Sequence, residues 1–380
     1  MNIYLSQRHP HADGVTPDTE LFQQALDELA QAGGGQLVVD CGRYALGGLR
    51  IGSNTCLWLS PGAELIVSEN YDDFAQATAL SRAESSDRAF LYAVDAQNIT
   101  ICGGGEIYGS ADGWFSRGVD AMGYRTPARA RPRIILLENC RRVRLENITV
   151  RHAPMWTIHL VSCTGVVVDG VTVDNDLTMA NTDALDIDSC QQVHIANSYF
   201  SAADDAICLK TTDKPERIQR PLRQVTIVNC TLRSKSCAFK IGTETWRDIE
   251  DVLVSNCTIF DSNRGIGLIS RDGGRLRRMI FSSIAFDCVS APACHWGEAD
   301  PVFLSTRRRD PAIEPGEISQ IQFRGLVGEC EGAINLHSET PGQIRRILFD
   351  GVQLTQKLNL AAEQGLYDIR PPCNPMSPTG

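Results

Sequence analysis

Five aspartates lie in a short part of the chain that otherwise has the alternating pattern of β-strands. They occur in NTDALDIDSC, residues 181–190, and in SAADDAICLK, residues 201–210: Asp183, Asp186, Asp188, Asp204 and Asp205. Carboxylates this close repel one another and resist burial, so we expect a role other than stability. Such carboxyl groups can hydrolyse a glycosidic bond, because one acid protonates the leaving oxygen while another carboxylate activates water. Mutual repulsion separates their pKa values and keeps one acid protonated near neutral pH.

Side chains alternate between the two faces of a β-strand, and this predicts where the polar residues point. In ALDID, Leu185 and Ile187 are expected inward and the aspartates outward. The same rule, applied to WTIHL, AICLK, AFKIG and GIGLIS, predicts an outer face that carries His159, Asp186, Cys208 or Lys210, Lys240, Gly267 and Ile269. The other three aspartates then fall at the turns that enter these strands. A calcium site and a solvated acidic turn remain alternatives to glycosidase chemistry.

The strands that must position these residues form a repeat. Apolar alternation followed by a small or amide residue recurs, and taking Asn147, Gly170, Asn197, Cys230 and Cys257 as equivalent gives spacings of 23, 27, 33 and 27 residues. Such spacings are typical of a solenoid. Each unit holds two or three short β-branched runs and lacks a helical period, which predicts an all-β fold: a single-stranded right-handed parallel β-helix of about ten rungs.

A second repeat concerns cysteine. Cys140, Cys163 and Cys190 each lie three residues before a valine that begins a strand. Equivalent side chains of stacked rungs lie on top of one another, so these cysteines are expected to form a packed column. The chain has 14 dispersed cysteines without a CxxC pair or zinc spacing, and we expect reduced, mostly buried thiols.

Helical periodicity is confined to the N-terminal region, in TPDTELFQQALDELAQAGGG. Asp18 or Thr19 is a plausible N-cap and Gly33 a stop signal. A helix over about residues 17–33 would cover the open end of the solenoid. We expect one domain over residues 1–380, with rungs over about 36–356 and an irregular tail over 357–380.

The charge and hydropathy patterns exclude several classes of function. A net charge of −10 argues against general binding to nucleic acid or to an anionic membrane. The N-terminal residues lack a signal-peptide pattern and no window has about 18 uninterrupted apolar residues, so a cytoplasmic protein is expected. Hydrolysis by carboxyl groups requires neither a metal nor an organic cofactor. The sequence predicts no oligomeric state.

Several segments resemble glycoside hydrolase family 28, the polygalacturonase-like β-helix enzymes. The similar segments, in the family's order, are DGVTPDTELFQQAL, GGGQLVV, SNTCLWLSPGAELI, RPRIILLENC, MWTIHLVSC, NTDALDIDSC and ADDAICLK. The resemblance implies that Asp204 is the general acid and that Asp183 with Asp205 activates the water. It also implies inversion at the anomeric carbon of a pectin-derived oligosaccharide, for which a carboxyl separation of about 6.5–9.5 Å is general.

Two positions depart from the family pattern. Cys237 in SCAFKIGT occupies the usual histidine position, and Gly267, Leu268 and Ile269 replace an Arg-Ile-Lys that holds a galacturonate carboxylate. A different sugar at that subsite, such as neutral rhamnose in rhamnogalacturonan, is one explanation. Replacement cations are the other. The candidate substrate-binding residues are Asn181, Asp186, His159, Lys210, Cys237, Lys240, Arg264 and Arg271.

The segment HWGEADPVFLSTRRRDP, residues 295–311, is a weaker candidate for a role at the site. A loop over the cleft, with His295, Trp296 and Arg307 near substrate, and a solvated basic loop both fit its composition. Trp156 is expected beside the groove, where it would either stack on a sugar ring or belong to the core.

Three interpretations of function follow. The first is an inverting hydrolase of pectin-type oligosaccharides, with exo action expected from the absence of an export signal. The second is a β-helix polysaccharide lyase or uronate epimerase. The third is a non-catalytic carbohydrate-binding β-helix.

Overall fold

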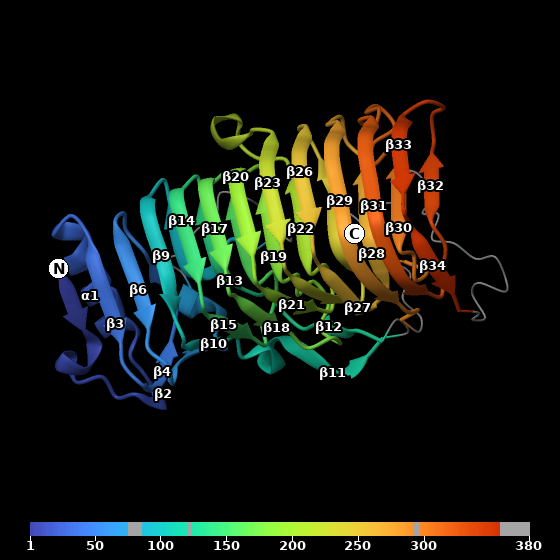
Figure 1. The fold of residues 1–380 in the computed structure, drawn as a ribbon. Helices are drawn as coiled ribbons and strands as arrows, with labels where there is room; N and C mark the ends of the chain where they lie inside the picture. The colour runs from blue at the N-terminus through green and yellow to red at the C-terminus, as the bar shows by residue number, and fades with distance from the viewer. Residues whose placement is uncertain (75–85, 121–122, 292–296, 358–380) are drawn as a thin grey trace.

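The protein is a right-handed parallel β-helix, as the repeat predicts (Figure 1). The computed structural model describes residues 1–74, 86–120, 123–291 and 297–357. Successive coils stack along one axis, with the N-terminus and α1 at one end and β32 to β34 near the other (Figure 1). Within these ranges one sheet has ten strands, which agrees with the expected number of about ten rungs.

The ten-stranded sheet contributes one strand from each of ten coils. Its strands are β5 (Leu49–Arg50), β8 (Ala89–Val94), β13 (Arg133–Glu138), β16 (Ile158–Val161), β19 (Leu185–Asp188), β22 (Ile207–Thr211), β25 (Cys237–Thr245), β28 (Arg264–Ser270), β30 (Val302–Thr306) and β32 (Asn335–Ser338).

The 22-stranded sheet forms the remaining sides of the coils. Its strands are β1 (Asn2–Tyr4), β2 (Asp13–Pro17), β3 (Gly35–Val39), β4 (Gly42–Leu46), β6 (Thr55–Leu59), β7 (Ala63–Val67), β9 (Gln97–Gly103), β10 (Glu106–Tyr108), β14 (Arg141–Glu146), β15 (Thr149–Arg151), β17 (Thr164–Asp169), β18 (Thr172–Asp174), β20 (Gln191–Ala196), β21 (Tyr199–Ala202), β23 (Leu222–Val228), β24 (Thr231–Ser234), β26 (Ile249–Ser255), β27 (Thr258–Ser262), β29 (Leu276–Cys288), β31 (Ile318–Cys330), β33 (Ile344–Asp350) and β34 (Gln353–Gln356).

A small antiparallel pair and short helices complete the described structure. The pair joins β11 (Phe115–Val119) to β12 (Arg125–Pro127), and the 3-10 turns are η1 (Leu5–Arg8), η2 (Tyr71–Phe74), η4 (Ala111–Trp114) and η5 (Glu216–Ile218). In the described ranges, no helix has the length and apolar character needed to cross a membrane.

Helix α1 (Thr19–Gln31) lies within the range predicted for the cap and ends two residues before Gly33. Its buried residues are Phe22, Ala25, Leu26 and Leu29, which share one face at helical spacing. Asp18 is the N-cap residue, but its carboxylate accepts the backbone N–H groups of His11 and Ala12 instead of capping the helix. The predicted tail beyond residue 357 lies outside the described residues.

The interior of the coils is a ladder of apolar side chains. Leu185 pairs with Ile207, Ile207 with Phe239, and Phe239 with Ile266, and all four are buried. Because side chains alternate along a strand, the residues next to each of these four in its own strand point away from this core. The predicted inward and outward assignment of ALDID is therefore confirmed.

The strand ends explain the repeat and correct its phase. Asn147, Gly170, Asn197, Asn229 and Asn256 all have positive φ, and their N–H groups bond to the next coil. Asparagine and glycine tolerate this left-handed conformation, which other residues adopt at a cost. Asn229 and Asn256 are thus the true equivalents of Asn197, and taking Cys230 and Cys257 was wrong by one residue.

The predicted cysteine column is confirmed. Cys140, Cys163 and Cys190 are fully buried, and the Cys163 N–H donates to the Cys190 sulfur over 3.2 Å. Each thiol donates to the carbonyl two residues earlier. Among the described cysteines all are free thiols, and only Cys41 and Cys56 are not buried.

Candidate active site

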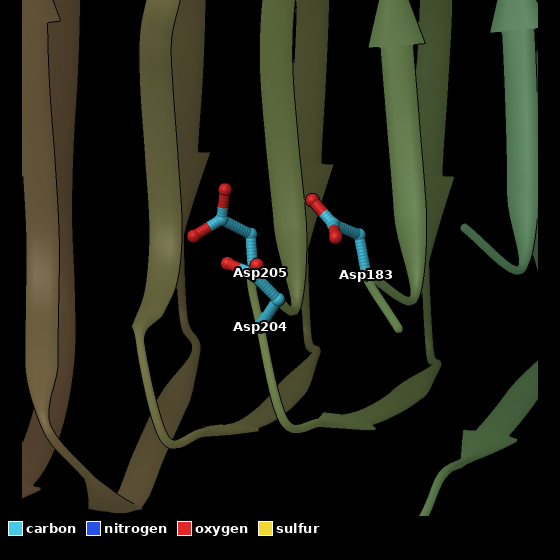
Figure 2. A group of neighbouring side chains, drawn as sticks. All are labelled: Asp183, Asp204 and Asp205. Atoms are coloured by element: carbon cyan, nitrogen blue, oxygen red, sulfur yellow. The ribbon is translucent and has the colours of Figure 1, made fainter. Parts of the chain in front are cut away.

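The acidic cluster forms where two neighbouring coils enter the ten-stranded sheet. Asp183 lies two residues before β19, and Asp205 lies two residues before β22. The Ala184 N–H donates to the Asp205 carbonyl over 2.9 Å, so the two turns are in register. Figure 2 shows the three side chains, Asp183 from one turn and Asp204 with Asp205 from the next. One carboxylate oxygen from each residue lies within 4.8 Å of the others.

This spacing differs from the prediction. The resemblance implied a carboxyl separation of about 6.5–9.5 Å, whereas the nearest oxygens of Asp183, Asp204 and Asp205 are within 4.8 Å. The turns bring all three acids to one point because they enter adjacent strands in register. The cluster is therefore a group of three acids and not a widely spaced pair.

Burial and mutual repulsion set the charge of these acids. Asp183 is 3% exposed and Asp205 is 1% exposed, whereas Asp204 is only half-buried. Burial, followed by the charge of Asp204, raises the pKa of Asp183 well above its usual range. Burial, followed by the charge of Asp205, also raises the pKa of Asp204. Both effects favour a protonated acid in the cluster near neutral pH.

Two lysines contact the acids. Lys240 Nζ lies 2.8 Å from Asp205 Oδ2. Lys210 Nζ lies 2.8 Å from Asp186 Oδ1 and 3.9 Å from Asp183 Oδ2. The Lys210 ammonium also lies 3.7 Å from the centre of the Trp156 ring, which is a cation–π contact. Both lysines predicted as candidate cations are thus beside the acids.

Three such carboxylate oxygens could also bind a divalent cation. In this cluster an ion would face the Lys240 ammonium beside Asp205 and the Lys210 ammonium beside Asp183. Two positive groups at this range repel a cation. The arrangement therefore favours acid–base chemistry over the calcium interpretation that the sequence left open.

The predicted outward column is present in the strand register. His159 pairs with Asp186, Asp186 with Cys208, Cys208 with Lys240, and Lys240 with Gly267. Lys210 pairs instead with Asp188 and bends back toward Asp186. The column thus contains Cys208, and Lys210 reaches the acids from the neighbouring position.

The structure corrects the prediction that His159 contacts substrate. Its side chain has no exposed surface, and the edge of the Trp156 ring packs against it at 4.9 Å between centroids. Burial lowers the pKa of His159 to about 3, which favours the neutral imidazole. Asp188 lies 3.6 Å away and is itself paired with Lys214 at 2.6 Å. Trp156, only 3% exposed, is likewise packed inside and not available as a sugar platform.

The structure also corrects the prediction that Arg264 binds substrate as a replacement cation. It is 2% exposed, forms an ion pair with Asp300 at 3.2 Å, and stacks over the Phe303 ring at 3.9 Å. A Cβ on Gly267 would lie 3.1 Å from Arg264 Cδ and 3.0 Å from Cys237 Sγ. Glycine at this position therefore leaves room for the arginine, whose charge is already neutralised by the buried carboxylate.

Cys237 lies on the coil that follows the coil of Asp205. The two coils are joined there by a hydrogen bond from the Ala206 N–H to the Cys237 carbonyl. The thiol is 1% exposed and donates to the Phe239 carbonyl over 3.1 Å. Burial raises the pKa of this thiol to about 12, so it is neutral. It packs beneath the surface of the site and does not replace a cationic histidine.

Two other predicted residues lie apart from the acids. Arg271 follows the last residue of β28 and Arg307 the last residue of β30, whereas the acids precede the strands of this parallel sheet. Arg271 is buried and donates to the Arg308 carbonyl over 3.2 Å. The structure therefore does not bring either arginine to the acidic cluster. His295 and Trp296 lie outside the described residues.

Asn181 lies beside the acids and is held by a residue that the sequence analysis missed. Arg131 donates to the Asn181 side-chain oxygen over 3.1 Å and to the Ala180 carbonyl over 2.7 Å. Next to them is a pocket of about 180 Å³ lined by Asp120, Tyr124, Arg125, Thr126, Pro127, Ala180, Asn181, Ala203 and Asp204. β12 forms one wall of this pocket, and no local motif marks that role in the sequence.

A family model described as glycosyl hydrolases family 28 matches residues 65–360. This chain belongs to that family. It is 27% identical over 268 residues to a probable polygalacturonase of Vitis vinifera, covering 67% of this chain and 54% of the relative. It is 24% identical over 334 residues to an exo-poly-alpha-D-galacturonosidase of Dickeya chrysanthemi, covering 74% of this chain and 54% of the relative. The chain thus spans about half the length of these curated relatives.

Solved structures support the fold. An exopolygalacturonase from Thermotoga maritima matches with a TM-score of 0.71 and 19% identity, covering 92% of both chains. A polygalacturonase from Erwinia carotovora matches with a TM-score of 0.71 and 18% identity, covering 90% of this chain and 92% of the other. At these identities the likeness establishes the β-helix that positions the acids.

Proposed function

We propose that the protein hydrolyses a glycosidic bond in a pectin-type oligosaccharide. The observation that carries this proposal is the meeting of Asp183, Asp204 and Asp205 within 4.8 Å on two adjacent coils. Membership of glycosyl hydrolases family 28 supports the reaction class. The printed names of the relatives, which include polygalacturonase and exo-poly-alpha-D-galacturonosidase, support the substrate class.

In this mechanism Asp204 protonates the leaving oxygen. It is the most exposed of the three acids, and burial together with the charge of Asp205 raises its pKa, which favours the protonated form. Asp205 accepts a proton from the attacking water, since its ion pair with Lys240 stabilises the carboxylate. Asp183 lies within 4.8 Å of both acids and, because burial raises its pKa well above the usual range, would help to orient the water as a hydrogen-bond donor. Attack opposite the leaving group would invert the anomeric carbon; this outcome is taken from the family resemblance, because acids within 4.8 Å are closer than the separation of about 6.5–9.5 Å that is general for inverting pairs.

The charges around the site support a neutral sugar where the family binds a uronate. Gly267 and Ile269 carry no charge, and Arg264 is paired with the buried Asp300. Lys240 and Lys210 are engaged with the acids of the cluster. Among the described residues named here, no cation is left to pair with a uronate carboxylate, which would therefore resist desolvation. A mixed chain of the rhamnogalacturonan type fits this distribution better than uniform galacturonan.

The test is product analysis on defined oligomers of galacturonan, rhamnogalacturonan and xylogalacturonan. We expect saturated products, an inverted anomer as the first product in ¹H NMR spectra, and release from a chain end. An unsaturated product that absorbs in the ultraviolet would identify a lyase and reject hydrolysis. Random internal cuts would reject exo action. Binding of an oligomer without cleavage would identify a non-catalytic carbohydrate-binding β-helix.

A further inference from the structure

Lys240 belongs to the column of outward-pointing residues on the ten-stranded sheet. It lies in register between Cys208 and Gly267, and its ammonium group is 2.8 Å from Asp205 Oδ2. The other oxygen, Asp205 Oδ1, accepts a hydrogen bond from Ser236 Oγ over 3.3 Å. Both oxygens of Asp205 therefore face donors. A carboxylate accepts at both oxygens, whereas a protonated acid must donate from one of them.

We propose that Lys240 is a positioning residue that holds Asp205 as the carboxylate base beside the general acid Asp204. This inference rests on the proposed function, because it divides the roles of acid and base within the same site. It assigns Lys240 a role through Asp205 and not through contact with a substrate carboxylate.

The surroundings of Asp205 explain why the ammonium group is needed. Asp205 is 1% exposed and lies among other carboxyl groups. The titratable and charged groups around it come from three coils and are Asp183, Asp186, Asp204, Cys208, Lys210, Cys237 and Lys240. Burial raises the pKa of the Cys208 and Cys237 thiols, so both are neutral. The charged neighbours are thus carboxyl groups and two lysines.

The two lysines, Lys210 and Lys240, lie closest to different acids. Lys210 is closest to Asp186, at 2.8 Å, and its ammonium lies against the Trp156 ring. Lys240 is closest to Asp205, also at 2.8 Å. The Asp205 contact raises the pKa of Lys240 above its usual value despite burial, so the lysine stays charged. Loss of Lys240 would leave Asp205 as a buried carboxylate without its nearest opposite charge.

The first test compares Lys240→Met with the wild-type protein over pH. Removal of the charge disfavours ionised Asp205, so we expect the acidic limb of kcat/KM to move by about 1–3 pH units to higher pH. Lys240→Gln keeps a donor without a charge and should move the limb in the same direction. Lys240→Arg restores the charge and should bring the limb back toward the wild-type position.

Lys235→Met is the matched control. Lys235 forms an ion pair at 3.1 Å with Asp261, which lies on a neighbouring coil and is not one of the three acids. Its loss removes one positive charge from the same region and should leave the limb in place. An unshifted limb in both Lys240→Met and Lys240→Gln, or an equal loss of activity at every pH, would overturn the proposal.

A second test does not depend on activity. Infrared or ¹³C NMR spectra of protein labelled at aspartate report how many carboxyl groups are ionised near pH 6. We expect one fewer carboxylate in Lys240→Met than in the wild type, and no such difference when Asp205→Asn is already present. Equal counts would refute the role of Lys240 even in a protein that hydrolyses pectin, whereas the expected counts without hydrolysis would reject only the proposed function.

Discussion

The outer faces of the two sheets differ in what surrounds their polar residues. On the 22-stranded sheet, outward residues such as Gln192, His194 and Asp251 are exposed, and strands alternate between exposed and buried positions. On the ten-stranded sheet, the outward residues Asp186 and Cys208 have no exposed surface. Both faces follow the same period of two. Alternation therefore identifies the side of the sheet but not whether that side is solvated.

The ion pairs show the same contrast. Arg278 and Asp251, on the 22-stranded sheet, have side chains that are 41% and 40% exposed. Lys210 and Asp186, on the ten-stranded sheet, are 3% and 0% exposed. Exposed pairs are weakened by water and salt, whereas breaking a buried pair leaves a charge without a partner. Similar pairs are thus expected to have very different effects when they are broken.

The largest effect on stability is expected for Lys210→Met. The substitution removes the ammonium partner of buried Asp186 and should lower the free energy of unfolding by about 3–5 kcal/mol at about pH 9, where Asp186 is ionised in the wild type. Urea denaturation measures this value. At pH 5 the loss should be smaller, because Asp186 can then take up a proton. A loss equal to that of an exposed pair would mean that the two faces do not differ.

The pH dependence of stability sharpens the comparison. Burial raises the pKa of Asp186 to about 7, above the value of about 3.9 for an unfolded aspartate. The folded state then binds more protons between these values, so this group's contribution to stability is present below about pH 4 and is lost as pH rises to about 7. Melting temperatures should fall over this window, and Asp186→Asn should reduce the slope.

Asp251→Asn is the control for this slope. A hydrogen bond from Arg278 lowers the pKa of Asp251, so its contribution is lost only as pH falls through that lowered value. The slope between about pH 4 and 7 should therefore be unchanged. An equal change in both variants would contradict the assignment of the slope to the buried acid.

The smallest effect is expected for Arg278→Ala. Arg278 contacts Asp251 and Glu250 on the exposed face. Its loss should lower the free energy of unfolding by about 1 kcal/mol or less, and by less at high salt. Urea denaturation in low and high salt provides the measurement. A loss as large as that of Lys210→Met would remove the distinction between the faces.

Much of this architecture could be predicted because it depends on local rules. The inward and outward assignment in ALDID, the cysteine column and the position of Asp183 before its strand follow from a period of two and from stacking. The phase error at Cys230 arose because the repeat was matched by small residues. The structure shows that positive φ at Asn229 is the shared property.

What could not be predicted depends on contacts between distant coils. Arg264 and Asp300 are 36 residues apart, and no spacing rule indicates that one neutralises the other. The Trp156 ring packs against His159, and Asp188 lies 3.6 Å from its imidazole, so a residue predicted to line the groove is buried. Local alternation does not indicate which loops or side chains cover an outward face.

The most direct test of the acid–base account is Asp204→Asn. If the proposed function holds, the protein without this proton donor should cleave a natural oligosaccharide about 10²–10⁴-fold more slowly while still binding it. A substrate with a nitrophenyl leaving group needs little protonation and should recover most of the rate, whereas Asp183→Asn should stay slow on both substrates. An unchanged kcat for Asp204→Asn on the natural oligosaccharide would contradict the account.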